Sequence, residues 1–225
     1  MTTSWLEGPA TVLADGTYCR VARSDQPLGF ATIAQPDAQL SFAGNRFDVL
    51  GGGVLYLGST AHGCYAETVA RFRPSAKVRA AVGDEPGFVI CGGIPADWRA
   101  RRLEVQVDLP DALPFVDVES PQTHTYLTAV MAPALAGLGV DALDVGLVRG
   151  RNRLITRAIA SWAYAATDPD GAPLYSGLRY LSRLGEEECW AVFDGTAVEE
   201  RSRSPIERTN SALDAVAQSF GLTVF

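Results

Sequence analysis

Residues 44–73, GNRFDVLGGGVLYLGSTAHGCYAETVARFR, place a strand pattern directly before a helix pattern. The apolar run 53–57 (GVLYL) is typical of a short buried strand that the chain enters through a glycine turn. Ser59 or Thr60 can cap the helix that follows, because a side-chain hydroxyl accepts a hydrogen bond from a free N–H group of the first turn. We expect this helix to continue to about Phe72, because a proline follows two residues later.

Strand and helix patterns also occur on both sides of this stretch. Within 152–166, Ile155, Ile159 and Trp162 recur at helical spacing, which predicts a helix with one buried face. Strands and helices are mixed without regular βαβ units, so we expect an α+β fold with a mixed or antiparallel β core and flanking helices. The other expected strands are 17–23 (TYCRVAR), 102–107 (RLEVQV), 115–118, 177–181 and 189–193, and the other expected helices are 121–135 and 211–220, the last ending at Gly221.

The length of 225 residues and the composition indicate one globular domain. Hydrophobic residues make up 47% and charged residues 20% of the chain, which excludes an intrinsically disordered protein and allows a sizeable core. We expect a single domain over residues 1–225, with its core at about 17–195 and a C-terminal helical appendage at about 196–225.

The chain is acidic, yet its cations are almost all of one kind. The 19 Lys and Arg residues stand against 26 Asp and Glu residues, which gives a net charge of −7. This charge excludes nucleic acid as the main partner, because proteins that bind nucleic acid carry a basic excess. Lys77 is the only lysine. Nearly every cation is therefore a guanidinium group, whose planar fork can hold a pyrophosphate through two oxygen atoms at once.

The sequence contains no segment that predicts export or membrane insertion. The first residues, MTTSWLEGPATVLADG, lack the basic start and the apolar stretch of a signal peptide. No apolar run reaches the ~18 residues that a membrane helix needs. We therefore expect a cytoplasmic protein without a membrane partner.

The cysteines, histidines and glycines do not match a general catalytic or metal motif. The four cysteines are far apart, form no CxxC pair and have mostly apolar neighbours, so buried reduced thiols are expected rather than a zinc site. The two histidines are also far apart, and no GxSxG motif supports a hydrolase triad, so both are expected to be structural. Neither GxGxxG nor GxxxxGK(S/T) occurs, which argues against Rossmann or P-loop nucleotide binding. The residues concerned are Cys19, Cys64, Cys91, Cys189, His62 and His124.

Four residues remain in two blocks that are far apart in the sequence. The first block has Arg46 in GNRF, Tyr56 in VLYLG and Glu67 in CYAETVARF. The second block has Ser182 in SGLRYLSRL, followed by the strand pattern CWAVF. In order and spacing, over roughly residues 17–195, these motifs resemble the RES domain, a family that is named for its Arg, Glu and Ser.

Two positions depart from the pattern of this family. Asp48 stands where members often have Asn, and Leu181 stands where Pro is frequent. Neither departure replaces one of the four residues named above.

The resemblance implies both a fold and a function. RES domains are similar in fold to ADP-ribosyltransferase toxins, and many are the toxic half of bacterial toxin–antitoxin pairs that consume NAD. The resemblance therefore implies that NAD is the substrate, with no cofactor and no metal, and that an Xre-type antitoxin is a protein partner. It also implies that the residues lining the NAD site are Arg46, Tyr56, Glu67 and Ser182.

The residue types at these positions suit the cleavage of NAD. Arg46 can hold the pyrophosphate, and Arg179 can help to neutralise it. Glu67 can stabilise the oxocarbenium character that develops at the anomeric carbon, and can hold the ribose 2′-hydroxyl or an attacking water. Tyr56 can stack on nicotinamide, and Ser182 can donate a hydrogen bond to a phosphate or ribose oxygen. No metal is required, because nicotinamide is cationic in NAD and leaves as a neutral molecule.

Simpler interpretations of the same residues stay open. Glu67 and Arg71 are four residues apart, so they can form a surface ion pair of about 0.3–0.5 kcal/mol. Tyr56 can be an ordinary core aromatic, Arg46 a solvated loop residue, and Arg179 part of a basic surface.

The acceptor of the ADP-ribosyl group also stays open. Water would make the chain an NAD glycohydrolase, phosphate would make it an NAD phosphorylase, and a protein side chain would make it an ADP-ribosyltransferase. A function of another class is a non-catalytic module that binds NAD or another protein. The oligomeric state, and the choice between a toxin and a stand-alone enzyme, are open as well.

Overall fold

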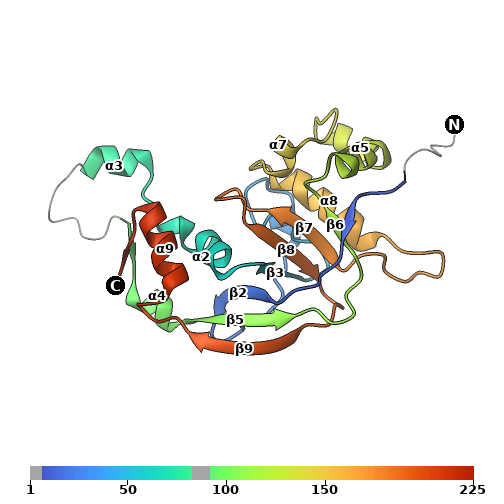
Figure 1. Ribbon diagram of the computed structural model, residues 1–225. Helices are drawn as coiled ribbons and strands as arrows, with labels where there is room; N and C mark the ends of the chain where they lie inside the picture. The colour runs from blue at the N-terminus through green and yellow to red at the C-terminus, as the bar shows by residue number, and fades with distance from the viewer. Residues whose placement is uncertain (1–6, 83–91) are drawn as a thin grey trace.

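The computed structural model describes residues 7–82 and 92–225. Within these residues the chain forms one eight-stranded sheet in the order β1-β6-β7-β8-β3-β2-β5-β9 (Figure 1). β6 and β7 are parallel, and the other neighbouring strands are antiparallel. The strands are β1 (Thr11–Val12), β2 (Tyr18–Arg23), β3 (Val54–Gly58), β5 (Arg102–Asp108), β6 (Phe115–Asp117), β7 (Gly177–Leu181), β8 (Glu188–Phe193) and β9 (Glu199–Pro205).

Helices lie in two groups at opposite ends of this sheet (Figure 1). One group packs on β7 and β8 in a shared core, and in the other group α2 packs against α9. A mixed sheet with flanking helices is an α+β fold, so this expectation is confirmed. The first group contains α5 (Pro121–Val130), α6 (Ala132–Gly137), α7 (Val145–Val148) and α8 (Arg153–Ala165). The second group contains α2 (Ala61–Val69), η1 (Ala70–Phe72), α3 (Ala76–Val82), α4 (Ala96–Ala100) and α9 (Ser211–Phe220). The short helix α1 (Gln35–Ala38) lies between β2 and β3.

Strand β3 shows how the sheet buries both of its faces. Val54 packs into the core that also contains residues of α8, and Tyr56 packs against the same core. Leu55 and Leu57 pack on the opposite face, together with Trp190 of β8. This alternation follows from the strand geometry, in which successive side chains point to opposite faces. It places the ring of Tyr56 on the face that carries α8.

The expected helix at 152–166 is α8. The side chain of Asn152 caps it by accepting a hydrogen bond from the N–H group of Leu154 at 3.1 Å. Ile155 and Ile159 are buried, and Trp162 is partly buried against the same core. The amphipathic pattern therefore predicted both the helix and its buried face.

The expected helix at 121–135 is two helices in the structure. α5 ends at Met131, and α6 begins with Pro133 in its first turn. Proline has no N–H group to donate to the preceding turn, and its ring disfavours a helical conformation of the residue before it. The sequence pattern continued through this break because apolar residues occur on both sides of it.

The expected C-terminal helical appendage is wrong for residues 199–205. They form β9, which pairs with β5 along the edge of the sheet. The sequence EERSRSP has no alternation of apolar and polar residues, because nearly all of these side chains are exposed. A final helix does follow as α9, and it ends at Gly221 in the left-handed conformation, as expected.

Several short elements were not expected. They are β1, α1, α3, α4, α7 and the small parallel pair of β4 (Gly93–Ile94) with β10 (Thr223–Val224). None of the described helices is both long and apolar enough to cross a membrane.

The thiols agree with the expectation for the cysteines that the structure describes. Cys19, Cys64 and Cys189 are free and buried, and burial raises the pKa of each thiol. Cys91 lies outside the described residues.

Candidate active site

A pocket of about 360 Å³ lies where β2, β3 and α2 meet the loop before Phe47 and the start of α8. Arg46, Tyr56 and Glu67 all line this pocket. Ser182 lies directly behind Glu67, and its hydroxyl donates a hydrogen bond of 2.5 Å to Oε1 of that carboxylate. Two segments that are 115 residues apart in the sequence therefore meet at one carboxylate.

The position of Glu67 depends on how closely α2 approaches β3. Thr60 caps α2 by accepting a hydrogen bond from the N–H group of Gly63 at 3.0 Å. A Cβ atom on Gly58 would lie only 2.8 Å from the sulfur of Cys64, so a glycine at the end of β3 allows this contact. Glu67 then stands one turn further along α2, exposed at the pocket.

The side chain of Arg46 is largely buried, unlike that of a solvated loop arginine. Its side chain donates hydrogen bonds to the carbonyl oxygens of Val148 at 2.9 Å and Leu181 at 3.3 Å. The guanidinium carbon lies 4.8 Å from the ring centre of Tyr180 and 5.1 Å from that of Phe47. Burial lowers the pKa of Arg46. Its Nε is buried and has no hydrogen-bond partner among the described residues.

The hydroxyl group of Tyr56 is already engaged within the protein. It donates a hydrogen bond of 2.8 Å to the carboxylate of Asp48 and accepts one of 3.1 Å from the N–H group of Phe47. Asp48 is buried and also accepts hydrogen bonds from the backbone and side chain of Asn45. Burial raises the pKa of Tyr56, and the carboxylate of Asp48 raises it further. Tyr56 and Asp48 therefore fix the loop that carries Arg46, while the ring of Tyr56 lines the pocket.

Three further arginines line the pocket beside the residues that the family motifs identified. Arg20 of β2 donates a hydrogen bond of 3.0 Å to the carbonyl oxygen of Gly29, and burial lowers its pKa to about 10. Arg153 begins α8 and donates to the carbonyl oxygen of Gly44. Arg183 is exposed, next to Ser182. Only the tertiary fold brings them together, because they belong to three separate segments.

The pocket is consequently cationic around one carboxylate. Among its described lining residues, Glu67 is the one acidic side chain, and it faces four guanidinium groups, which are Arg20, Arg46, Arg153 and Arg183. This charge distribution exists in a chain whose net charge is −7.

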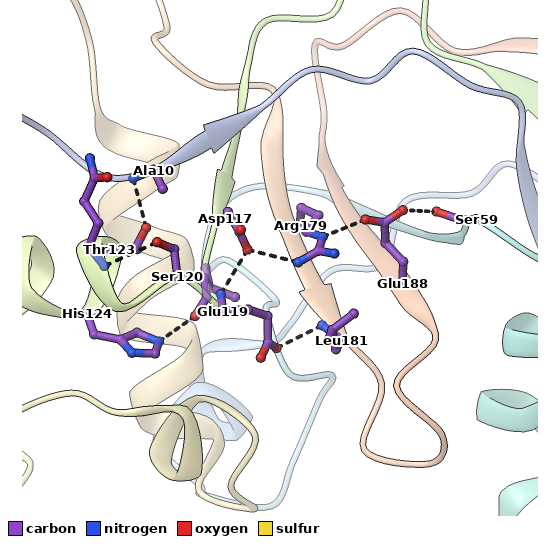
Figure 2. A network of polar contacts seen from close by, with 12 residues as sticks. Ala10, Ser59, Asp117, Glu119, Ser120, Thr123, His124, Arg179, Leu181 and Glu188 are labelled. Atoms are coloured by element: carbon purple, nitrogen blue, oxygen red, sulfur yellow. Dashed lines mark hydrogen bonds and ion pairs between the residues drawn. The ribbon is translucent and has the colours of Figure 1, made fainter.

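Arg179 is not brought to this pocket. Its side chain forms ion pairs with Glu188 at 2.7 Å and with Asp117 at 3.3 Å (Figure 2). These carboxylates already neutralise the guanidinium group, and alternation along β7 separates Arg179 from Tyr180, which lines the pocket. The structure therefore gives Arg179 the role of a tie between strands in place of the expected contact with NAD.

The network in Figure 2 also supports the strand end that carries Ser182. Glu119 accepts a hydrogen bond of 2.9 Å from the N–H group of Leu181. Arg149 donates a second one, of 2.8 Å, to the same carboxylate. Ser182 follows immediately, with its own N–H group bonded to the carbonyl oxygen of Glu187 at 2.7 Å. The hydroxyl that meets Glu67 also accepts a hydrogen bond of 3.0 Å from the N–H group of Leu184, so the backbone on both sides of Ser182 holds it in place.

The remaining candidates have partners outside the pocket. His62 contacts Glu187 at 2.8 Å, and the buried His124 contacts the carbonyl oxygen of Val118 at 2.8 Å. Among the described residues, no ion pair joins Glu67 to Arg71. In the described ranges no cluster of three His, Cys, Asp or Glu side chains can hold a metal ion.

The comparison with protein families agrees with the motifs. The family model of the RES domain matches residues 18–213. Among solved structures, a chain of the M. tuberculosis MbcT–MbcA toxin–antitoxin complex is similar, with 13% sequence identity and a TM-score of 0.48; the alignment covers 94% of this chain and 90% of that chain. No curated protein matches. Because the family model spans most of the chain and includes Arg46, Tyr56, Glu67 and Ser182, this chain belongs to the RES domain family.

Proposed function

We propose that the chain is an NAD-consuming enzyme that cleaves the bond between nicotinamide and ribose. The observation that carries the proposal is the single carboxylate, Glu67, held by Ser182 at a pocket whose other charged lining residues are all arginines. NAD needs both features, because its pyrophosphate is anionic while positive charge develops at the reacting ribose carbon. Membership of the RES family supports the same substrate.

In this proposal Glu67 acts on the reacting carbon. The bond from C1′ of the ribose to the ring nitrogen of nicotinamide breaks, and its electron pair stays with nicotinamide, which leaves as a neutral molecule. The carboxylate of Glu67 stabilises the oxocarbenium character at C1′ electrostatically, as carboxylates do in enzymes that cleave glycosides. Ser182 positions that carboxylate through its hydrogen bond of 2.5 Å.

We assign the pyrophosphate to the more accessible arginines. The NH groups of Arg46 are engaged with two backbone carbonyl oxygens, and the side chain is 9% exposed. Arg153 is partly exposed and Arg183 exposed, and each guanidinium group has five N–H donors, which exceeds the number of contacts it makes within the chain. Arg46 then builds the floor of the pocket, and the other two hold the phosphates. Tyr56 offers its ring face to nicotinamide.

The acceptor decides the name of the activity. Water gives ADP-ribose, phosphate gives ADP-ribose 1″-phosphate, and a protein side chain gives an ADP-ribosylated protein. In each case an oxygen or nitrogen atom of the acceptor forms the new bond to C1′, and the acceptor loses a proton. We propose a glycohydrolase or a phosphorylase, which chromatography of the co-product, with and without added phosphate, distinguishes.

The test is Glu67→Gln. This variant keeps the size of the side chain and an oxygen atom that can accept the hydrogen bond of Ser182, but it removes the negative charge. We expect the release of free nicotinamide from NAD to fall by about 10²–10³-fold, which is the magnitude typical of one lost electrostatic contact to a transition state.

The matched control is Glu207→Gln, which removes one carboxylate from an exposed position outside the pocket. It should keep the wild-type rate. If the wild-type protein releases no nicotinamide at high enzyme concentration, the proposal fails. Tight NAD binding without any release would indicate a non-catalytic NAD-binding module.

We also propose an antitoxin-like protein as the partner, on the basis of the family. A partner that inhibits by covering the pocket must compete with NAD. Binding of the partner should therefore weaken in proportion to added NAD, and binding that does not change with NAD would exclude inhibition at this pocket.

A further inference from the structure

A second pocket, of about 470 Å³, lies outside the one that contains Glu67. It is formed by the end of β2, by η1, by α4 and by the beginning of β5. Four arginines line it, together with two aspartates. A volume of this size is in the range of small-molecule sites, which is ~300–1,000 Å³. The charged residues are Arg23, Arg71, Arg101, Arg102, Asp25 and Asp97.

The arginines of this pocket have few anionic partners. Arg101 forms an ion pair of 2.9 Å with Asp97. In the described part of the chain, Arg23, Arg71 and Arg102 form no ion pair within 4.0 Å. Neighbouring positive charges disfavour one another. Burial lowers the pKa of Arg102, and the neighbouring guanidinium groups of Arg71 and Arg23 lower it further.

Aromatic side chains hold two of these guanidinium groups in place. Arg71 lies 4.9 Å from the ring centre of Phe72, and Arg102 lies 4.9 Å from that of Trp98. The two rings pack edge to face, with their centres 6.0 Å apart. Trp98 is 3% exposed, and its indole N–H group has no hydrogen-bond partner among the described residues. The pocket thus presents three guanidinium groups without a carboxylate partner among the described residues, two of them held against aromatic rings, and a bound anion would stabilise such groups.

We propose that this second pocket binds a ligand with two or more linked phosphate groups, either a nucleoside polyphosphate or free polyphosphate. Phosphate suits the site because each guanidinium fork can hold two of its oxygen atoms. Arg23 and Arg71 are exposed and approach from two different elements, so they can contact separate phosphate groups of one ligand. A ligand with linked phosphates can contact both arginines at once, whereas a ligand with a single carboxylate cannot.

The second pocket shares two structural elements with the first. β2 carries Arg20 in the first pocket and Arg23 in the second, and Arg71 follows Glu67 by four residues, one helical turn later. A ligand in the second pocket is therefore bound beside the candidate active site but not in it. The proposal concerns binding, so it does not depend on the proposed NAD cleavage.

The test is calorimetric titration of the full chain with sodium tripolyphosphate at constant low ionic strength, because salt screens such contacts. We expect the double variant Arg23→Gln/Arg71→Gln to bind at least tenfold more weakly than the wild type. Both side chains are exposed, so the fold should be kept, and an unchanged melting temperature checks this.

The control variant, Lys77→Gln/Arg208→Gln, makes the same change in net charge at exposed positions outside both pockets. It should bind within twofold of the wild type. A second pair, Arg153→Gln/Arg183→Gln, removes cations from the first pocket and should leave the tripolyphosphate site of the second pocket intact.

The proposal is overturned if Arg23→Gln/Arg71→Gln binds tripolyphosphate as well as the wild type does, or if only the Arg153→Gln/Arg183→Gln pair loses binding. A parallel titration with ATP identifies the source of the phosphates. Tighter binding of ATP supports a nucleotide, and equal binding supports free polyphosphate. If the wild-type protein released no nicotinamide but still bound tripolyphosphate, the proposed NAD function alone would be contradicted.

Discussion

At the scale of single residues, the hydroxyl of Tyr56 forms two hydrogen bonds to the loop that precedes its strand. It joins the buried carboxylate of Asp48 to the N–H group of Phe47 and so closes the loop that begins with Asn45 and Arg46. Asp48 is the position where this chain departs from the Asn that is frequent in the family. A carboxylate there accepts hydrogen bonds from both Tyr56 and Asn45, so the acidic residue is satisfied inside the fold.

We predict that Tyr56→Phe destabilises the protein by about 1–3 kcal/mol, because it leaves the N–H group of Phe47 without an acceptor and removes one of the donors to the buried carboxylate of Asp48. The free energy of unfolding in urea measures this cost. Tyr126→Phe is the matched control, because the hydroxyl of Tyr126 has no hydrogen bond among the described residues. Equal stability of the two variants would show that the hydroxyl of Tyr56 does not hold the loop.

Glu67 and Ser182 illustrate what residue-level reasoning could establish. The family motifs identified both residues, and the structure adds the contact of 2.5 Å between them. Arg20 and Arg153 lie outside the motifs, and Arg183 follows Ser182 within SGLRYLSRL, but only the fold shows that all three converge on the pocket. Arg179 belonged to the motif region but faces the other side of β7, where two carboxylates neutralise it.

At the scale of elements, the end of α9 at Gly221 was predicted correctly because local chemistry decides it. Asn210 caps α9 by accepting a hydrogen bond from the N–H group of Leu213 at 3.0 Å, and Gly221 ends it with a φ of 63°. These signals act over three or four residues, and they can be recognised without knowledge of the tertiary structure.

We predict that Gly221→Ala destabilises the protein by about 1 kcal/mol, because an L-residue is strained at positive φ. The added Cβ would have only the side chain of Arg79 within 4 Å, at 3.8 Å, so a steric clash does not contribute. Thermal unfolding measures the effect. Gly137→Ala in α6 is the matched control, because its φ is not positive and its Cβ would meet nothing within 4 Å. It should be neutral or slightly stabilising, and an equal loss at both positions would contradict this explanation.

Elements that depend on distant partners were predicted less well. β9 has polar residues on both faces and becomes a strand only because β5 offers it an unpaired edge. The charged side chains and Pro205 at this edge also discourage pairing with another chain. The missing alternation that hid β9 from sequence reasoning is therefore a consequence of its place at the edge of the sheet.

At the scale of the whole molecule, three buried thiols lie near the contact between β2, β3, β8 and α2. Burial raises the pKa of Cys189 from its ordinary value of 9.0 to about 12, and it also raises the pKa of Cys19 and Cys64. In the unfolded chain these thiols lose their protons near pH 9.0, whereas in the folded protein they keep them. The unfolded state then binds fewer protons, so the free energy of unfolding decreases as the pH rises.

We predict that stability is insensitive to these thiols below about pH 8 and falls between about pH 9 and pH 10. At the upper end of this window Arg20, whose pKa burial lowers to about 10, also titrates. Denaturant unfolding at a series of pH values measures the slope. Cys189→Ala should reduce the slope of the free energy of unfolding between pH 9 and pH 10, whatever its effect on the absolute stability. An unchanged slope would show that this thiol does not contribute.

The sequence by itself determined the α+β class, most of the longer strands and helices, and the four residues that identify the RES family. It could do so because periodicity, caps and motifs are properties of short segments. Only the tertiary structure decided that β9 joins the sheet, that Arg46 lies on backbone carbonyl oxygens, and that arginines from separate segments surround Glu67. These features depend on contacts between residues that are far apart in the chain. The charge of each pocket follows from the same contacts, because it is set by which side chains the fold brings together within a few ångströms, whatever the net charge of the chain.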